Sequence, residues 1–220
     1  MTKINNCFLS AKNFLILLLT LACLSGTAQN KSNRHEGWIT LSASKKVADK
    51  WKVNLTAHSQ NRLDHGSYVN FIQAGVSYNL SSGLYFSGQY RLEESKKPSE
   101  WISENRIQAI AGYKWKLGNW KFRNRYRLEF RKFANKSLKY RHRADIDIKI
   151  PTSVFKTYTP YFNQELQFSD KVLSRTRSYV GITGKGKLVV PSVYLLWQTD
   201  KRDWGRQNTF GLGVKLDFKL

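Results

Sequence analysis

The sequence predicts an all-β fold, a single up-and-down antiparallel β-barrel that crosses a membrane. Apolar and polar residues alternate with a period of two in segment after segment, which places them on opposite faces of β-strands. Turn residues separate these segments, with no break in composition. The clearest segment, Trp120–Arg131, has four arginines on one face and mainly aromatic or aliphatic side chains on the other. Such a strand separates an apolar medium from a charged, wet one.

Eleven segments alternate in this way and predict the strands of one domain. Membrane barrels of bacteria normally have an even number of strands, so an odd count needs an explanation. Either a weak strand lies within 29–37, or one of the eleven segments is not in the wall. We therefore expect 10–12 strands and favour 12. The segments are 38–45, 51–60, 70–80, 84–93, 102–115, 120–131, 138–150, 158–168, 175–183, 188–198 and 208–220.

The connections between these segments fall into two groups. Short turns alternating with longer polar loops are typical of outer-membrane barrels, in which the short turns lie on the periplasmic side. We predict short turns at 81–83, 117–119 and 184–186, and longer loops at 61–67, 94–100, 133–137, 169–174 and 199–207.

The N-terminal segment has the pattern of a secretory signal peptide. Lys3 and Lys12 precede the apolar run 14–24, and Gly26 and Ala28 suit the −3 and −1 positions of a cleavage site. The alternative is a membrane anchor, but the run is shorter than the roughly 20 residues of a membrane-spanning helix. We expect residues 1–28 to be the signal peptide and residues 29–220 to form the barrel.

Composition excludes several kinds of site. Both cysteines, Cys7 and Cys23, lie in the expected leader, so the mature chain has no disulfide, thiolate metal site or cysteine nucleophile. Without Lys3 and Lys12, 35 of the 37 basic residues remain, against 15 acidic ones. This excess favours a polyanionic partner. Because the chain is exported, we expect an anionic membrane surface and no nucleic acid.

The apolar face must be either inside the barrel or outside it. A soluble barrel would bury the apolar face, whereas a membrane barrel turns it towards lipid and keeps the charges in its lumen. Beyond about eight strands the lumen is too wide for apolar side chains to fill. Trp115 and Trp120 flank the 117–119 turn, where an interfacial aromatic girdle would lie. We therefore expect a lipid-facing apolar surface, closed by the C-terminal strand, which includes Phe218.

Several short motifs recur in an order typical of a known group. They are Arg123-x-Arg125-x-Arg127, Tyr140-Arg141-x-Arg143, PYFNQE at 160–165, Arg175-x-Arg177 with Gly181, and Asn208-x-x-Gly211. Over most of the mature chain the sequence resembles the domain-of-unknown-function 2490 family of outer-membrane barrels. The resemblance implies a barrel fold and a location in the cell outer membrane. It implies no catalytic or ligand-binding residues, because no activity is assigned to the family.

The charged residues on the predicted inner face are the candidate site. They can form a structural network in which guanidinium groups pair with carboxylates and close the lumen. Alternatively, they line a narrow passage that prefers anions, because the basic members are in excess. The set is Arg91, Glu93, Glu104, Arg106, Arg123, Arg125, Arg127, Glu129, Arg141, Arg143, Asp145, Asp147, Glu165, Arg175 and Arg177.

A membrane-embedded lipid hydrolase is an alternative hypothesis. A lipid hydrolase would need a serine or threonine beside a histidine base. The chain has four histidines, of which His142 shares the predicted lipid-facing side with Tyr140 and Ala144, and no serine partner for it can be identified. The glycine-rich segment 181–187 lacks the hydroxyl residue of a phosphate loop at position 188 and predicts a hairpin turn. We expect no catalytic residue, no metal site and no cofactor.

The expected function is that of a structural barrel or a narrow passage for anions or small solutes. A surface-binding barrel and a membrane-embedded lipid-modifying enzyme are the alternatives. The expected partners are outer-membrane lipid, the machinery that inserts barrels, and lipopolysaccharide, which would meet the loop cations Lys96-Lys97 and Lys201-Arg202.

Overall fold

The computed structural model describes residues 33–63, 66–96, 100–134, 136–151, 157–170, 172–202 and 205–220. The predicted signal peptide, 1–28, lies outside these residues. No helix in the described part of the chain is long and apolar enough to cross a membrane. The described residues form eleven strands: β1 (Asn33–Lys46), β2 (Trp51–Arg62), β3 (Gly66–Asn79), β4 (Leu84–Lys96), β5 (Trp101–Leu117), β6 (Trp120–Phe133), β7 (Lys139–Lys149), β8 (Tyr158–Ser169), β9 (Val172–Gly184), β10 (Val189–Arg202) and β11 (Gly205–Lys219).

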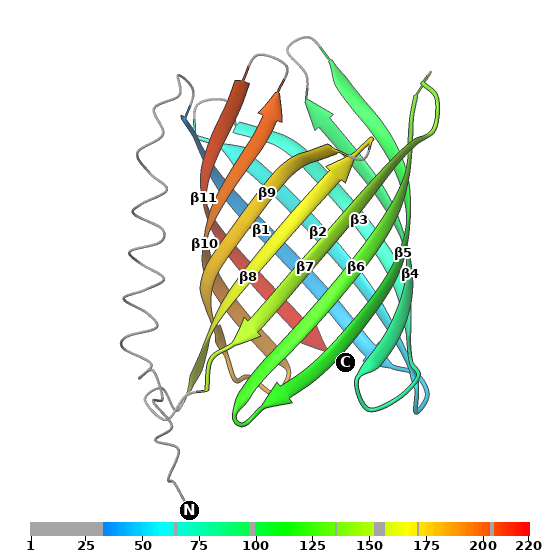
Figure 1. The fold of residues 1–220 in the computed structure, drawn as a ribbon, viewed down its shortest axis with the longest axis vertical. Helices are drawn as coiled ribbons and strands as arrows, with labels where there is room; N and C mark the ends of the chain where they lie inside the picture. The colour runs from blue at the N-terminus through cyan, green and yellow to red at the C-terminus, as the bar shows by residue number, and fades with distance from the viewer. Residues whose placement is uncertain are drawn as a thin grey trace, which may run out of the picture. The chain divides into compact units, whose positions relative to one another are not determined.

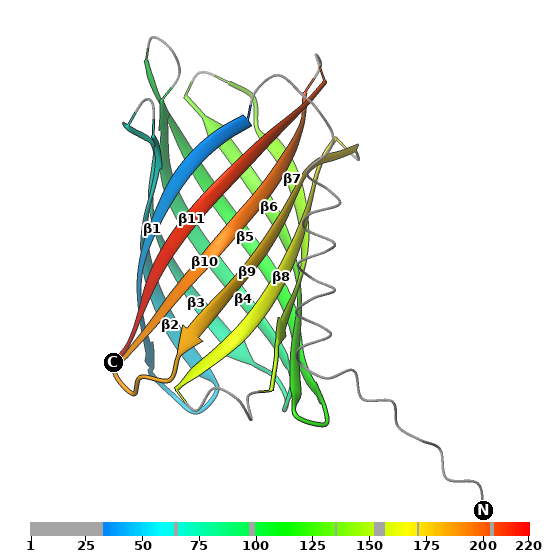
Figure 2. The same cartoon turned by 90° about the vertical axis from the view of Figure 1, so that its left-hand side faces the viewer.

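The strands close into a barrel in which each strand pairs with its neighbours in sequence (Figure 1). They cross the barrel obliquely, as closure of a sheet requires. Every consecutive pair is antiparallel, but β1 and β11 pair in parallel, from Asn33 opposite Asn208 to Ser44 opposite Lys219 (Figure 2).

The predicted all-β barrel is confirmed, but the favoured count of twelve strands is wrong. All eleven alternating segments are in the wall. Of the segment 29–37, in which an extra strand was considered, residues 33–37 are the start of a longer β1, and residues 29–32 lie outside the described residues. With an odd number of alternating strands, the first and the last run in the same direction. The barrel can then close only through one parallel pair, so the expectation of a purely antiparallel sheet fails at this seam.

The predicted contrast between short turns and long loops is also wrong. β8 and β9 are separated only by 170–171, and β10 and β11 only by 203–204, because the strands continue through most of the predicted loops. The longest connection, 150–157, lies at the end where we predicted short turns. The polar strand ends escaped detection because the period of two marks a strand only where its faces meet different media.

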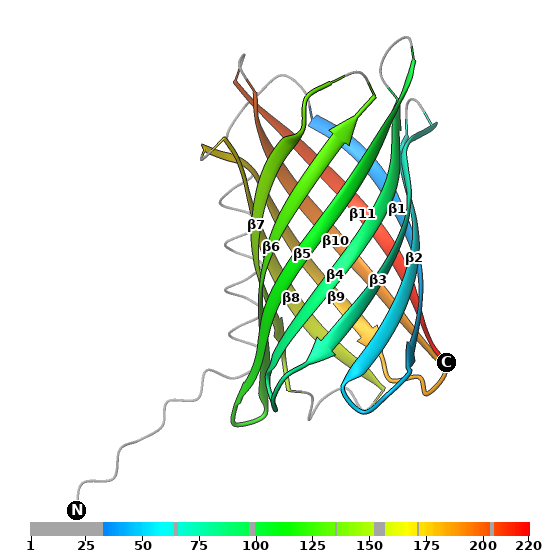
Figure 3. The same ribbon diagram turned by 90° about the vertical axis from the view of Figure 1, so that its right-hand side faces the viewer.

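The surface of the barrel is apolar on the outside and polar on the inside. Leu195 is 64% exposed and Tyr126 49% exposed, whereas Arg127 and Glu129 are 6% and 0% exposed. β6 lies between β5 and β7 in the wall (Figure 3). Its burial pattern makes the arginine face the inner face, as predicted, and the aromatic face the outer one. Asn124 is a polar residue on that exposed outer face, and Lys132 is another, near the end of the strand.

On the inner face of the barrel, two tyrosine rings lie over glycines of neighbouring strands. Tyr85 of β4 is opposite Gly112 of β5, and Tyr194 of β10 is opposite Gly213 of β11, in direct cross-strand register. A Cβ atom at Gly112 would lie 2.3 Å from the Tyr85 ring, and one at Gly213 would lie 2.1 Å from the Tyr194 ring. The glycines make room for rings that fill the interior.

Replacing Gly112 by alanine is therefore expected to destabilise the barrel by about 1–3 kcal/mol, because the Tyr85 ring must leave its position. Urea-induced unfolding in lipid vesicles measures the change. Gly88→Ala, on the outer face of β4, is the matched control, since a Cβ atom there meets nothing within 4 Å. Equal stability of the two variants would contradict this account of the rings.

Candidate functional site

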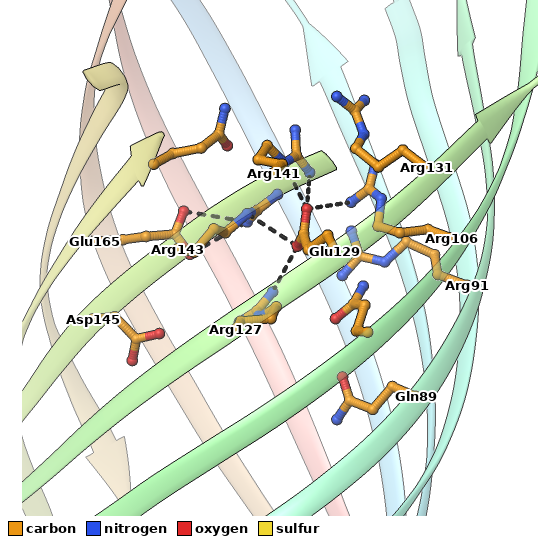
Figure 4. A network of polar contacts seen from close by, with 12 residues as sticks. Gln89, Arg91, Arg106, Arg127, Glu129, Arg131, Arg141, Arg143, Asp145 and Glu165 are labelled. Carbon is orange, nitrogen blue, oxygen red and sulfur yellow. Dashed lines mark hydrogen bonds and ion pairs between the residues drawn. The ribbon is translucent and has the colours of Figure 1, made fainter. Parts of the chain in front are cut away.

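Glu129 is the centre of the charge network inside the barrel. Its carboxylate forms ion pairs with four arginines on three adjacent strands: Arg141 at 2.5 Å, Arg143 at 3.1 Å, Arg127 at 3.5 Å and Arg106 at 4.0 Å (Figure 4). We name these five residues the Glu129 hub. They come together because β5, β6 and β7 are consecutive and because alternation turns all five side chains inwards.

The network extends from the hub in both directions around the barrel. Towards β4, Arg106 contacts Glu104 at 2.7 Å and Glu93 at 3.0 Å. Towards β9, Glu165 of β8 joins Arg143, at 3.2 Å, to Arg177, at 3.3 Å. Ion pairs therefore link six consecutive strands, β4 to β9.

The remaining predicted charges are also paired inside the barrel. All fifteen residues of the set singled out from the sequence take part in ion pairs. The other pairs are Arg125 with Asp145 at 2.8 Å, Arg123 with Asp147 at 3.5 Å, Arg91 with Glu93 at 3.2 Å, and Arg175 with Asp200.

The most deeply buried part of this network is balanced in charge. Among the described residues, six buried arginines face six buried carboxylates. A balanced, paired layer of this kind holds the strands together and offers no net attraction to a passing anion. The arginines are Arg91, Arg106, Arg127, Arg141, Arg143 and Arg177, and the acids are Glu36, Glu104, Glu129, Asp145, Glu165 and Asp200.

The excess positive charge lies around a cavity at one end of the barrel. This cavity, which we name the cup, has a volume of about 830 Å³. Arg34 and Arg62, which line it, lie where β1 begins and β2 ends, beside the β2–β3 hairpin. Lys136, between β6 and β7, also lines it. The cup is therefore at the end of the barrel drawn at the top of Figure 1. Of the described residues that line it, sixteen are arginine or lysine and five are carboxylates. Its lining stops short of the inward-facing Tyr85 and Tyr161 near the opposite end.

Part of the cup is aromatic. Trp38 of β1, Phe71 of β3, Tyr179 of β9 and Tyr194 of β10 line it, and we name these four residues the aromatic wall. Trp38 packs against Tyr179 with ring centroids 6.4 Å apart, and Tyr179 against Tyr194 at 5.6 Å. Guanidinium groups stack on the wall: Arg91 lies 3.7 Å from the centre of Phe71, and Arg177 lies 5.2 Å from that of Trp38.

We did not predict the aromatic wall from the sequence. The signal was available, because Tyr179 alternates in phase with Arg175 and Arg177 on the inner face of β9. In β10, residues 194–197 are all apolar or aromatic, so no alternation showed which of them point inwards. In the structure Tyr194 and Leu196 point inwards and Leu195 points outwards.

His142, considered from the sequence as the base of a lipid hydrolase, has a tyrosine as its hydrogen-bond partner. On the outer face, His142 Nδ1 is 2.5 Å from the hydroxyl of Tyr126, so its hydrogen bond goes to a tyrosine and not to a serine or threonine nucleophile.

A second histidine, His58, lies in the cup with its Nδ1 2.7 Å from the hydroxyl of Thr40. The Gln60 amide oxygen accepts a hydrogen bond from Tyr68 at 2.9 Å, so its NH₂ group faces His58 Nε2 at 3.1 Å. Nε2 is then the acceptor nitrogen, and Nδ1 carries the proton and donates to Thr40. An imidazole in this tautomer cannot take the proton of Thr40.

The fold and its interior define a class of protein: a closed eleven-strand β-barrel with an apolar exterior and an ion-paired lumen. The chain belongs to the family described as "Protein of unknown function (DUF2490)", whose model matches residues 35–208. No curated protein sequence matches the chain. Among solved structures, it is similar to LpxR from Salmonella typhimurium, with a TM-score of 0.48 and 9% sequence identity over 76% of this chain and 83% of that chain.

Proposed function

We propose that the protein is an integral outer-membrane barrel, closed inside by the ion-pair network, that binds anionic groups in the cup. Its exterior supports the membrane location. Exposed leucine, isoleucine and valine side chains cover the outer surface, as on a wall that faces lipid. Exposed tryptophans lie towards both ends, with Trp51 and Trp115 at one end and Trp101 at the other. In this proposal residues 1–28 direct export, and the C-terminal strand directs insertion.

The single observation that carries the binding function is the charge of the cup. Of the described residues, sixteen basic ones and five carboxylates surround about 830 Å³ of space. Six of the sixteen are the buried arginines, which buried carboxylates balance, so the excess comes from the less buried arginines and lysines. Cations crowded around a concave, partly dry site raise the local concentration of anions. The balanced layer supports a closed lumen rather than a continuous anion passage.

The test is a calorimetric titration of the folded protein in detergent with inorganic pyrophosphate. We expect pyrophosphate to bind, and to bind more weakly as NaCl is raised, because salt screens exposed charges. Spermidine, a small polycation, is the control ligand and should give no binding heat. The absence of pyrophosphate binding at low salt by protein with the β-sheet circular dichroism of the folded state would contradict the proposal.

Planar-bilayer recordings separate a binding barrel from a passage. The closed lumen is expected to give no conductance steps. Stable anion-selective steps would replace this part of the proposal by the narrow anion passage that the sequence also suggested.

We also propose that lipopolysaccharide contacts the mouth of the cup. Lys96 and Lys201 are exposed, and both border the cavity. Phosphate groups of an outer-leaflet lipid would meet these two cations before reaching the arginines further inside.

A further inference from the structure

Arg127 differs from the other buried arginines in how weakly it is paired. Its closest ion-pair distance is 3.5 Å, to Glu129, and its Nε has no hydrogen-bond partner among the described residues. The other five buried arginines each have a polar contact of 3.2 Å or less, although Arg143 Nε and Arg141 Nη2 also lack a hydrogen-bond partner in the described part of the chain. The side chain of Arg127 is nevertheless only 8% exposed.

This arrangement leaves donors of a buried cation unused. A guanidinium has five N–H donors, and burying it without matching acceptors is costly. Directly opposite Arg127 on β7 lies Arg143, so two like charges face each other across neighbouring strands. Glu129 serves three further arginines and cannot satisfy Arg127 alone. An added anionic group would accept hydrogen bonds from the unused donors of Arg127 and reduce its repulsion with Arg143.

Arg127 also lies on the wall of the cup that faces the aromatic wall. In the closed order of strands, β6 is on the far side of the barrel from β1, and the aromatic wall lies on β1, β3, β9 and β10. Arg127 lines the same cavity as Trp38 and Tyr179, and its side chain points into the lumen (Figure 4). The cavity therefore offers an unsatisfied cation on one side and ring surfaces on the other.

We propose that the ligand of the cup is an aromatic anion: a phosphate or carboxylate group bound by Arg127, joined to a planar ring that packs on the aromatic wall. This inference rests on the proposed function and specifies its ligand. A guanidinium binds such groups through two parallel hydrogen bonds. The cup volume of about 830 Å³ is within the usual range for sites of small molecules.

Two probes that differ only in the ring test the ring contact. Phenyl phosphate and methyl phosphate carry the same anionic group, and calorimetry on the folded protein compares them. We expect phenyl phosphate to bind roughly three- to tenfold more tightly, the usual size of an aromatic contact. The variant Tyr179→Leu should lose this preference and still bind methyl phosphate, and Phe71→Leu provides a second variant if the first does not fold.

The role of Arg127 is tested by the variant Arg127→Gln. This variant should bind both probes about tenfold more weakly or worse, because it lacks a charged hydrogen-bond donor. Arg123→Gln is the matched control. Arg123 is on the same strand and faces the same way, but it pairs with Asp147 and does not line the cup. Its replacement should leave both affinities unchanged.

The outcomes distinguish this inference from the proposed function. Equal affinities for the two probes, or pyrophosphate binding without phenyl phosphate binding, would overturn the aromatic ligand and leave an anion-binding cup. Phosphate binding that survives Arg127→Gln in folded protein would place the anion at the rim and overturn the assigned site. Failure of all three anions to bind would overturn the proposed function itself.

Discussion

Replacing Glu129 by glutamine is expected to lower the free energy of unfolding by about 3–5 kcal/mol, the usual effect of removing one partner from a buried ion-pair network. Glu129 is fully buried and contacts four arginines. Without its charge, these guanidinium groups repel one another in a site that water barely reaches. The amide retains the size of the side chain, so the loss reports charge and hydrogen bonding rather than a cavity.

Urea-induced unfolding in lipid vesicles measures this effect, and Asp217→Asn is its control. Asp217 also pairs with a cation, Lys215 at 2.9 Å, but its side chain is 33% exposed. A solvated pair of this kind contributes about 0–1 kcal/mol. If the free energy of unfolding fell by the same small amount in both variants, the Glu129 hub would not be the structural centre of the lumen.

Replacing Leu195 by arginine is expected to destabilise the barrel in lipid by about 2–4 kcal/mol, the cost of a cation near the middle of a bilayer. Leu195 is 64% exposed near the midpoint of β10, between Val180 and Leu212 of the adjacent strands, which are also exposed. In a water-soluble barrel, the same substitution at an exposed position would have little effect. The result therefore tests which medium surrounds the wall.

Leu63→Arg provides the comparison for this experiment. Leu63 is 83% exposed and follows the last residue of β2, in the connection to β3, outside the expected bilayer core. The substitution Leu63→Arg should lower the free energy of unfolding by less than about 1 kcal/mol, because the penalty for a cation falls towards the membrane interface. Equal stability of Leu195→Arg and Leu63→Arg would contradict a membrane-embedded exterior.

The network and the cup have different requirements. In the network, four glutamates are shared between arginines of different strands, which links the strands from β4 to β9: Glu93, Glu104, Glu129 and Glu165. Around the cup, the cations exceed the acids, which leaves capacity for an anion. The sequence could not show which of the fifteen predicted inner charges line the cup, because that depends on the level of each side chain in the barrel.

The sequence by itself determined the strands and, where apolar and polar residues alternate, the side on which each residue lies. Alternation on β6 placed Arg123, Arg125 and Arg127 together, because a period of two follows from local backbone geometry. It could not give the strand ends beyond the apolar belt, where both faces are polar.

Only the tertiary structure decided the parallel β1–β11 seam, the four arginines on Glu129 and the aromatic wall opposite Arg127. The physical reason is closure. The offset between neighbouring strands accumulates around the ring, and it sets which side chains share a level of the lumen. That offset is a property of the whole barrel, whereas the pattern of any one strand records only which way its residues point.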